Sequence, residues 1–248
     1  MLIIGKNPVL ETLRQSPEEI ISIKYSSSVD KKKIAEIISL AEKKKINVER
    51  IQKDLFDKLF EPKDKSEGIS QGIVAEIKDF VYYDFFKLLD EIKNKDKALL
   101  LILDEIKDPH NLGAIIRTAS AVNVDGIILT EKNSAKVNHT VYKTSSGTIN
   151  FVKIVLAGNI YNTIKALKEA GVNITGTTLN AEKSLYDYQF AEKTAIIFGN
   201  EEKGMRTMLK KLCDDVIKIP MFGKTESLNV SVSAGVILYE GIRQRLLP

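Results

Sequence analysis

Small and polar residues gather between Ile219 and Gly235, near the C-terminal end of the chain, in a pattern that suits ligand binding. Ser227 and Asn229 are residue types that start helices well, and an apolar run to Leu247 follows them. The pattern predicts a helix whose first turn follows a polar loop. The N–H groups of a first helical turn have no partner within the helix and carry partial positive charge, so they suit an electron-rich ligand.

A second candidate site is the segment from Asp108 to Thr118, which closely follows an apolar run that predicts a buried strand. Asn111 stands where a helix cap belongs, and Arg117 lies six positions later, in the second turn of the predicted helix. Arg117 interrupts small and apolar residues, so we expect its side chain on the buried side with an anionic partner. That partner is either a ligand or the carboxylate of a structural salt bridge, and this segment alone leaves both open.

A third candidate is the loop Gly199–Met205, which carries Glu201 between two glycines and follows a predicted strand at 195–198. Glycine allows the backbone to approach a ligand closely. In open α/β sheets, ligands bind at the carboxyl ends of the strands, where this loop begins. Taken alone, the loop could equally be a plain turn.

The elements that must position these loops alternate between strand and helix from Ala98 onward, which is typical of a mainly parallel sheet with helices on both faces. The predicted strands cover 98–103, 126–129, 151–156, 172–177, 195–198 and 216–219, and the predicted helices cover 111–122, 160–170 and 228–247. Residues 1–77 predict a smaller α/β unit, and 78–97 predict a linker with an aromatic anchor. The expected domains are therefore 1–77, the linker 78–97, and 98–248.

The composition excludes several classes of protein. At 248 residues, with 44% hydrophobic and 28% charged residues, the chain is typical of a soluble globular protein, and no apolar run is long enough for a membrane helix. Cys213 is alone and cannot form an internal disulfide, which fits a reducing cytoplasm. With His110 and His139 far apart, no metal-ligand cluster is expected. The net charge of +4 is compatible with a nucleic-acid partner, although the lysine clusters are equally typical of a solvated helix face.

Taken together, the three loops resemble the motifs of the SpoU-type RNA 2′-O-ribose methyltransferases of the SPOUT class. The loops match the family's three motifs in order: Asp108–Ala119, Gly199–Met205, and Ile219–Met221 with Ser227–Val232. The segments Ile4–Glu11 and Gln71–Ile73 resemble the ends of the family's N-terminal substrate-binding domain, so the resemblance covers nearly the whole chain. The subgroup most resembled is the bacterial 23S ribosomal RNA guanosine-2′-O-methyltransferases.

The resemblance implies a small N-terminal L30e-like α/β domain for substrate binding and a C-terminal parallel-sheet α/β domain with a trefoil knot. It also implies S-adenosylmethionine as the methyl donor, bound in a cleft at the knot. By motif, backbone groups at Gly199, Ile219 and Leu228 would hold the adenosine part, with Thr177 nearby to serve a ribose or carboxylate group. Family members work as homodimers with the last helix commonly in the interface. The apolar positions 232, 236, 239 and 242 could serve either the core, which we favour, or that interface.

The resemblance further implies that Arg117, Glu201, Ser227 and Asn229 carry the reaction, with Asn111 in support and no metal. In this family the arginine at the position of Arg117 is often assigned as the general base. A guanidinium is essentially always protonated in proteins, however, so Arg117 could equally hold the target phosphate and orient the 2′-hydroxyl. Glu201 is expected to fix either Arg117 or Asn111.

The expected function is transfer of a methyl group to the ribose 2′-hydroxyl of a guanosine in 23S ribosomal RNA in the cytoplasm. One alternative is the same chemistry on transfer RNA, although the transfer-RNA relatives typically lack the N-terminal domain. Another is a catalytically silent RNA-binding protein of ribosome assembly, which the intact motif residues disfavour. A resistance-type methyltransferase that acts at another ribosomal RNA nucleotide is the third.

Overall fold

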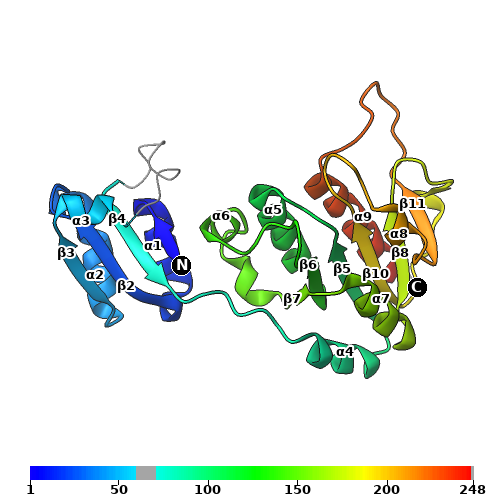
Figure 1. Ribbon diagram of the computed structural model, residues 1–248, viewed down its shortest axis with the longest axis horizontal. Helices are drawn as coiled ribbons and strands as arrows, with labels where there is room; N and C mark the ends of the chain where they lie inside the picture. Colours follow the sequence, from blue (N-terminus) through cyan, green and yellow to red (C-terminus); the bar gives the residue numbers. More distant parts are fainter. Residues whose placement is uncertain (60–70, 247–248) are drawn as a thin grey trace. The chain divides into compact units, whose positions relative to one another are not determined.

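The computed structural model describes residues 1–59 and 71–246, and the chain divides into two compact units, Met1–Phe80 and Val81–Pro248. We call them the N-terminal unit and the C-terminal unit and describe each by itself (Figure 1). Among the described residues, no helix combines the length and apolar character needed to cross a membrane.

The N-terminal unit is a small α/β fold around a four-stranded mixed sheet in the order β1-β4-β2-β3. Strand β2 pairs parallel with β3 and antiparallel with β4, which also pairs antiparallel with β1. Its strands are β1 (Leu2–Ile4), β2 (Ile20–Ser26), β3 (Asn47–Ile51) and β4 (Ile73–Ile77). Its helices are α1 (Lys6–Gln15), α2 (Ala35–Lys43) and α3 (Lys53–Asp57), with 3-10 turns at Pro17–Glu19 and Lys31–Ile34.

The C-terminal unit is built on a seven-stranded sheet in the order β7-β6-β5-β10-β8-β11-β9, and every pairing in it is parallel. Its strands are β5 (Ala98–Leu103), β6 (Gly126–Thr130), β7 (Ile154–Ala157), β8 (Asn173–Thr177), β9 (Lys183–Ser184), β10 (Lys193–Phe198) and β11 (Asp215–Lys218). The prediction of a parallel α/β sheet after a smaller N-terminal α/β unit is thus confirmed.

Helices cover both faces of this sheet (Figure 1). They are α4 (Phe85–Lys93), α5 (Pro109–Ala121), α6 (His139–Thr144), α7 (Ile160–Glu169), α8 (Thr207–Lys210) and α9 (Val230–Leu246), with 3-10 turns at Thr148–Phe151 and Leu185–Asp187. Side chains of α4, α7 and α8 join Leu100 and Ile102 of β5 in one apolar cluster. Leu99 and Leu101, which point to the opposite face, are equally buried, and α5 packs against α6 and α9. Burial on both faces explains why β5 is a continuous apolar run.

Two of the predicted segments differ from their expected descriptions, and α6, α8 and β9 were not predicted. The stretch 78–97, expected as a linker with an aromatic anchor and a charged helical part, contains α4, whose side chains Leu88, Leu89 and Ile92 are buried in the apolar cluster of the C-terminal unit. The strand expected at 151–156 begins only at Ile154, because the preceding residues form a 3-10 turn that leaves Phe151 81% exposed.

The apolar positions on α9 were wrongly expected to favour the core. Val232 and Tyr239 are 50% and 56% exposed, whereas Ala234, Ile237 and Leu238 are buried. The buried residues recur at spacings of three and four, so they form the face of α9 that packs inward, next to α5. The expected stripe therefore includes the outer side of the helix.

Candidate functional site

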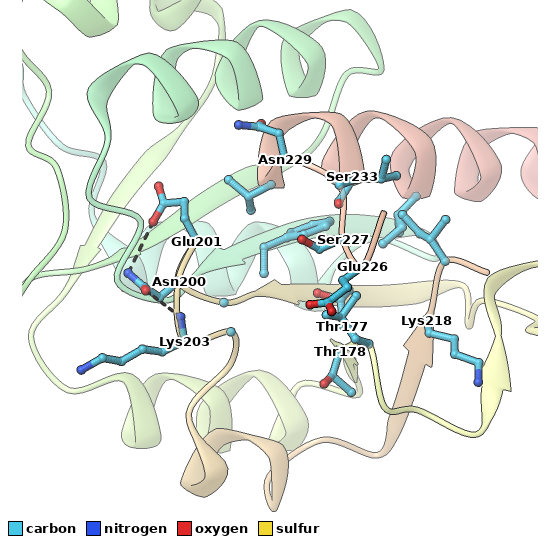
Figure 2. A pocket seen from close by; sticks show the side chains of 18 of the residues that line it. Thr177, Thr178, Asn200, Glu201, Lys203, Lys218, Glu226, Ser227, Asn229 and Ser233 are labelled. Carbon is cyan, nitrogen blue, oxygen red and sulfur yellow. Dashed lines mark hydrogen bonds between the residues drawn. The ribbon is translucent and has the colours of Figure 1, made fainter. Parts of the chain in front are cut away.

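A cavity of about 610 Å³ lies at the carboxyl ends of β8, β10 and β11, beside the start of α9. Its lining comes from four segments: the residue Asn111, the residues 177–180 after β8, the loop Phe198–Gly204, and the stretch from Ile217 through the first turns of α9. Figure 2 shows the side chains of these segments around one space. The volume falls within the range of about 300–1,000 Å³ that is usual for small-molecule and cofactor sites.

The cavity brings together eight of the nine residues that the sequence selected. The lining includes all four expected cofactor-binding residues and all the expected catalytic residues except Arg117 (Thr177, Gly199, Ile219, Leu228, Asn111, Glu201, Ser227 and Asn229). The three loops do converge, as parallel strands with adjacent carboxyl ends require.

The loop Gly199–Gly204 after β10 is closed on itself. The backbone N–H of Asn200 donates to the carbonyl of Gly204 (3.1 Å), and the N–H of Gly204 donates back to the carbonyl of Asn200 (2.8 Å). A Cβ atom on Gly199 would lie 2.1 Å from the backbone nitrogen of Met205. Only glycine fits at this position, which explains why the loop begins with one.

A chain of side-chain hydrogen bonds links the three loops. Asn111 Nδ2 donates to Glu201 Oε1 (3.2 Å), and Asn229 Nδ2 donates to Asn111 Oδ1 (3.0 Å). Glu201 also accepts longer bonds from the backbone N–H groups of Lys107 and Asp108, both at 3.4 Å. Asn200 Nδ2 donates to Glu201 Oε2 as well (3.4 Å, Figure 2), so the Glu201 carboxylate is held by four donors. Asn111 therefore bridges the loop after β10 and the start of α9.

Helix α9 begins directly after Asn229, which is its capping residue. Asn229 Oδ1 accepts from the backbone N–H of Ser231 (2.8 Å), and the Asn229 carbonyl accepts from the N–H of Ser233 (2.9 Å). In α5 the prediction that Asn111 is the cap was wrong. Asp108 caps that helix through the N–H of His110 (2.8 Å), because Pro109 fits the first helical position without needing its missing N–H. Asn111 lies within the first turn, buried, and its amide is free for the bridge.

The rest of the cavity combines apolar walls with hydroxyl groups. Ile219 and Leu228 are partly exposed on the lining. Thr177 donates its hydroxyl proton to the carbonyl of Ile197 (2.9 Å), so toward a ligand this hydroxyl can act only as an acceptor. Ser227 is exposed at the cavity, near Glu226 in the same loop (Figure 2). Apolar walls with a few placed polar groups are typical of sites for small molecules and cofactors.

The expectation that the Arg117 side chain is buried was wrong. Arg117 is exposed on α5, and in the described part of the chain it forms no ion pair; Glu201 binds Asn111 instead. The buried face of α5 is formed by residues such as Leu112, Ile115 and Ile116, which leaves position 117 outside. An exposed guanidinium without a protein partner remains available to an anion from outside.

The sequence analysis did not identify several polar residues that organise the site. Asn200 is buried, and its side chain accepts from the N–H groups of Glu202 (3.0 Å) and Lys203 (3.1 Å). Asp104 and Arg206 form an ion pair beside the loop. Asn200 could have been found from its place inside the Gly-Asn-Glu turn, since asparagine side chains often bond the backbone two residues on. In the described residues no group of three or more His, Cys, Asp or Glu side chains is placed to hold a metal ion.

Comparisons with known proteins agree with this geometry. The model of the SpoU rRNA Methylase family matches residues 98–239, and the model for RNA 2′-O ribose methyltransferase substrate binding matches residues 2–83. The 23S rRNA (guanosine-2′-O-)-methyltransferase RlmB of Escherichia coli (strain K12) is 34% identical over 98% of this chain and 98% of its own length. YacO of Bacillus subtilis (strain 168), assigned by name to the TrmH family of tRNA/rRNA methyltransferases, is 35% identical over 98% and 95%.

Solved structures share the fold. The SpoU methyltransferase AviRb from Streptomyces viridochromogenes, in complex with its cofactor AdoMet, has a TM-score of 0.74 at 24% identity and covers 100% of this chain and 91% of its own. The TrmH/SpoU tRNA modifying enzyme of A. aeolicus is 32% identical with a TM-score of 0.55, and covers 65% of this chain and 82% of its own. Its motifs, its fold and these matches over both units show that the chain belongs to the SpoU family of RNA 2′-O-ribose methyltransferases.

Proposed function

We propose that the protein transfers a methyl group from S-adenosylmethionine to the ribose 2′-hydroxyl of a guanosine in 23S ribosomal RNA. The observation that carries the choice of RNA is the coverage of the matches. RlmB aligns over 98% of this chain, including the N-terminal unit, whereas the tRNA modifying enzyme of A. aeolicus covers only 65% of it. The N-terminal unit, matched by the substrate-binding model, would choose the RNA by its shape and exposed loop nucleotides.

The residues present fit S-adenosylmethionine, which supplies the methyl group on a positively charged sulfur. The apolar walls at Ile219 and Leu228 suit the adenine ring, and the closed loop at Gly199 offers backbone groups at its edge. The Thr177 oxygen can accept a hydrogen bond from a ribose hydroxyl. The methyl acceptor must lie in line with the sulfur and the methyl carbon, so holding both partners in position supplies much of the rate.

The hydrogen-bonded residues Asn111, Glu201 and Asn229, together with the exposed hydroxyl of Ser227, would orient the 2′-hydroxyl in this site. We assign Arg117 to the phosphate next to the target nucleotide, because its guanidinium is exposed and stays protonated. The proton of the 2′-hydroxyl then leaves through phosphate or water.

The proposal extends to the trefoil knot, the homodimer and the cytoplasmic location. The exposed Val232 and Tyr239 on α9 offer an apolar surface to a second copy. Cys213, the single cysteine, suits a reducing compartment.

The test is transfer of labelled methyl from S-adenosylmethionine into undermethylated total RNA, which is then separated into ribosomal and transfer fractions, with Arg117→Ala alongside. We expect label at guanosine 2′-oxygens of the large ribosomal RNA, lost in Arg117→Ala. Label in transfer RNA would keep the chemistry and overturn the substrate. Bound RNA without any label would favour a silent RNA-binding protein.

A further inference from the structure

Asp104, the first residue after β5, has a side chain that is 0% exposed. Arg206 donates from Nε and Nη2 to the two oxygens of this carboxylate, at 3.1 and 2.5 Å. Arg206 Nη1 also lies 3.3 Å from Glu105 Oε1. A buried carboxylate is costly unless it is paired and hydrogen-bonded, so Asp104 fixes the position of the guanidinium.

This pair lies at one end of the loop that lines the cofactor cavity. Arg206 follows Gly204 by two residues and precedes α8. At the other end of the loop, Asn200 Nδ2 donates to the backbone carbonyl of Glu105 (2.8 Å). Both ends of the loop are therefore attached to consecutive residues, Asp104 and Glu105, at the carboxyl end of β5.

The turn that holds the two attachments is itself fixed. Glu105 has φ of 57°, a left-handed conformation that non-glycine residues adopt only under constraint. Its N–H donates to Thr130 Oγ1 (3.0 Å), and its carboxylate accepts from Asn133 Nδ2 (3.2 Å). The attachments of the loop thus end on a turn that is tied to the loop after β6.

We propose that Asp104 and Arg206 are positioning residues that hold the Gly199–Gly204 loop in the conformation that receives S-adenosylmethionine. This inference rests on the proposed function. Between the two attachments lies Glu201, which binds Asn111 at 3.2 Å, so a loop released at its Arg206 end would move Glu201 away from the bridge between the loops.

The charge of Arg206 is secure in this place. Desolvation acts to lower its pKa, but hydrogen bonds and attraction from Asp104, with further attraction from Glu105, raise the pKa above its ordinary value. The guanidinium therefore stays protonated in this place.

Strand β5 also provides a matched control at its opposite end. Asp104 also accepts from the backbone N–H of Arg206 (3.4 Å), so it binds one backbone N–H and one cation. Asp125 does the same, because it accepts from the backbone N–H of Leu99 (2.7 Å) and pairs with Lys95. Its side chain is 14% exposed, and it lies at the amino edge of the sheet, away from the cavity. Asp125→Asn removes the same kind of contact without touching the loop.

The experiment measures two properties of the full-length protein in the variants Arg206→Gln, Arg206→Lys, Asp104→Asn, Asp104→Asn with Arg206→Gln, and Asp125→Asn. The first is hydrogen exchange of residues 199–205 without cofactor, and the second is the Kd for S-adenosylmethionine by calorimetry. If loss of the pair leaves the loop in its binding conformation about a tenth of the time, the Kd rises about tenfold. We expect this rise, with faster exchange at Asn200 and Gly204, in Arg206→Gln and in Asp104→Asn.

The two residues act as one pair, so the double variant should bind S-adenosylmethionine no more weakly than either single variant does. Arg206→Lys keeps a single ionic contact, so its Kd and its exchange rates should lie between those of wild type and of Arg206→Gln. Asp125→Asn should keep wild-type exchange in 199–205 and a wild-type Kd although its thermal midpoint falls.

Wild-type exchange and affinity in Arg206→Gln would overturn the inference, as would an equal loss of affinity in Asp125→Asn. If a single variant does not fold because it leaves its charged partner unpaired, the double variant decides, since it removes both charges and keeps a polar side chain at each position. A wild-type protein that binds no S-adenosylmethionine would contradict the proposed function, and the exchange of 199–205 would then decide the role of the pair separately.

Discussion

The two edges of the parallel sheet use the same kinds of polar side chain for different purposes. At the amino edge, Asp125 and Asp214 accept from the backbone N–H groups of Leu99 (2.7 Å) and Ile174 (2.9 Å), across 26 and 40 positions of sequence. At the carboxyl edge, the bonds of Asn111 to Glu201 and to Asn229 span 90 and 118 positions. The carboxylates at the amino edge accept from backbone N–H groups at strand ends, whereas the side chains at the carboxyl edge join three loops around a cavity.

This difference separates stability from function. When a carboxylate that binds the backbone N–H of one strand end is lost, the free energy of unfolding falls but the cavity keeps its shape. Glu201 and Asn229, which bind Asn111 from two other loops, are exposed and contribute little to stability, but their loss changes the site. Substitutions at the two edges should therefore produce opposite patterns.

Among the variants that compare the two edges, the largest effect is expected for Glu201→Ala. Its carboxylate accepts from Asn111 Nδ2 and from the N–H groups of Lys107 and Asp108, and removal of a positioned polar group from an active site typically costs about 100-fold or more in rate. Methyl transfer at saturating S-adenosylmethionine should fall by this factor, with unfolding free energy within about 0.5 kcal/mol of wild type.

The matched change at the amino edge is Glu192→Ala, which removes only an exposed salt bridge to Lys97. Its rate should equal that of wild type, since exposed pairs contribute little. Equal rates in Glu201→Ala and Glu192→Ala would contradict the assignment of the site.

Asn229→Asp separates the two roles of Asn229. The aspartate keeps the acceptor for Ser231 and so keeps the helix cap, but it loses the donor to Asn111 Oδ1. We expect a loss of methyl transfer of about tenfold, equivalent to about 1.4 kcal/mol in the barrier, with little change in thermal midpoint. Steady-state kinetics and thermal unfolding measure both.

Asn159→Asp is the control for that change, because Asn159 caps α7 through the N–H groups of Tyr161 and Asn162. Both variants keep their caps, and only Asn229→Asp loses a bond between loops. A tenfold loss of rate in Asn159→Asp as well would mean that the added negative charge at a helix start, and not the lost bond between the loops, lowers the rate.

Asp125→Asn should give the opposite pattern to Glu201→Ala. The amide can no longer pair as an anion with Lys95, and the N–H of Leu99 loses a charged acceptor. We expect a loss of about 1–2 kcal/mol in unfolding free energy, measured by denaturant titration, with methyl transfer within twofold of wild type. If the rate of methyl transfer fell by more than the loss of stability explains, the distinction between the two edges would be wrong.

The smallest effect concerns pH at the amino edge. Hydrogen bonding from Lys183, together with that from Tyr188, lowers the pKa of Asp215 below its ordinary value although burial acts to raise it. The stabilisation is present above the unfolded pKa, near 4, and is lost as pH falls through the lower folded value. Asp215→Asn should therefore reduce the loss of stability between pH 7 and pH 3 by less than about 1 kcal/mol, measured by urea unfolding. An unchanged pH dependence in the variant would contradict this.

The sequence was sufficient for six of the seven strands of the parallel sheet and for the convergence of the loops, but the two-residue strand β9 was not predicted. Strand β5 was predicted with its observed bounds, because a strand buried on both faces is apolar at every position. The meeting of the loops that carry Asn111, Gly199 and Asn229 followed from the rule that parallel strands have their carboxyl ends at one edge.

The remaining features depend on packing that local patterns do not record. Helical periodicity placed Arg117 around α5 but could not say which side faces α6 and α9, and the structure puts Arg117 outside. Asn111 matched a cap by residue type, yet Asp108 before Pro109 takes that role. The pairing of Asp104 with Arg206 spans 102 positions, and no periodicity connects residues so far apart.

The most direct test of the account is a calorimetric titration of S-adenosylmethionine into the wild-type protein and into Leu228→Arg. Leu228 lines the cavity and is only partly buried, so arginine is tolerated by the fold but fills the space and repels the positive sulfur. We predict binding to wild type and no measurable binding to the variant, with the same thermal midpoint for both. Equal affinity in the two proteins would contradict the placement of the cofactor at the carboxyl edge of the sheet.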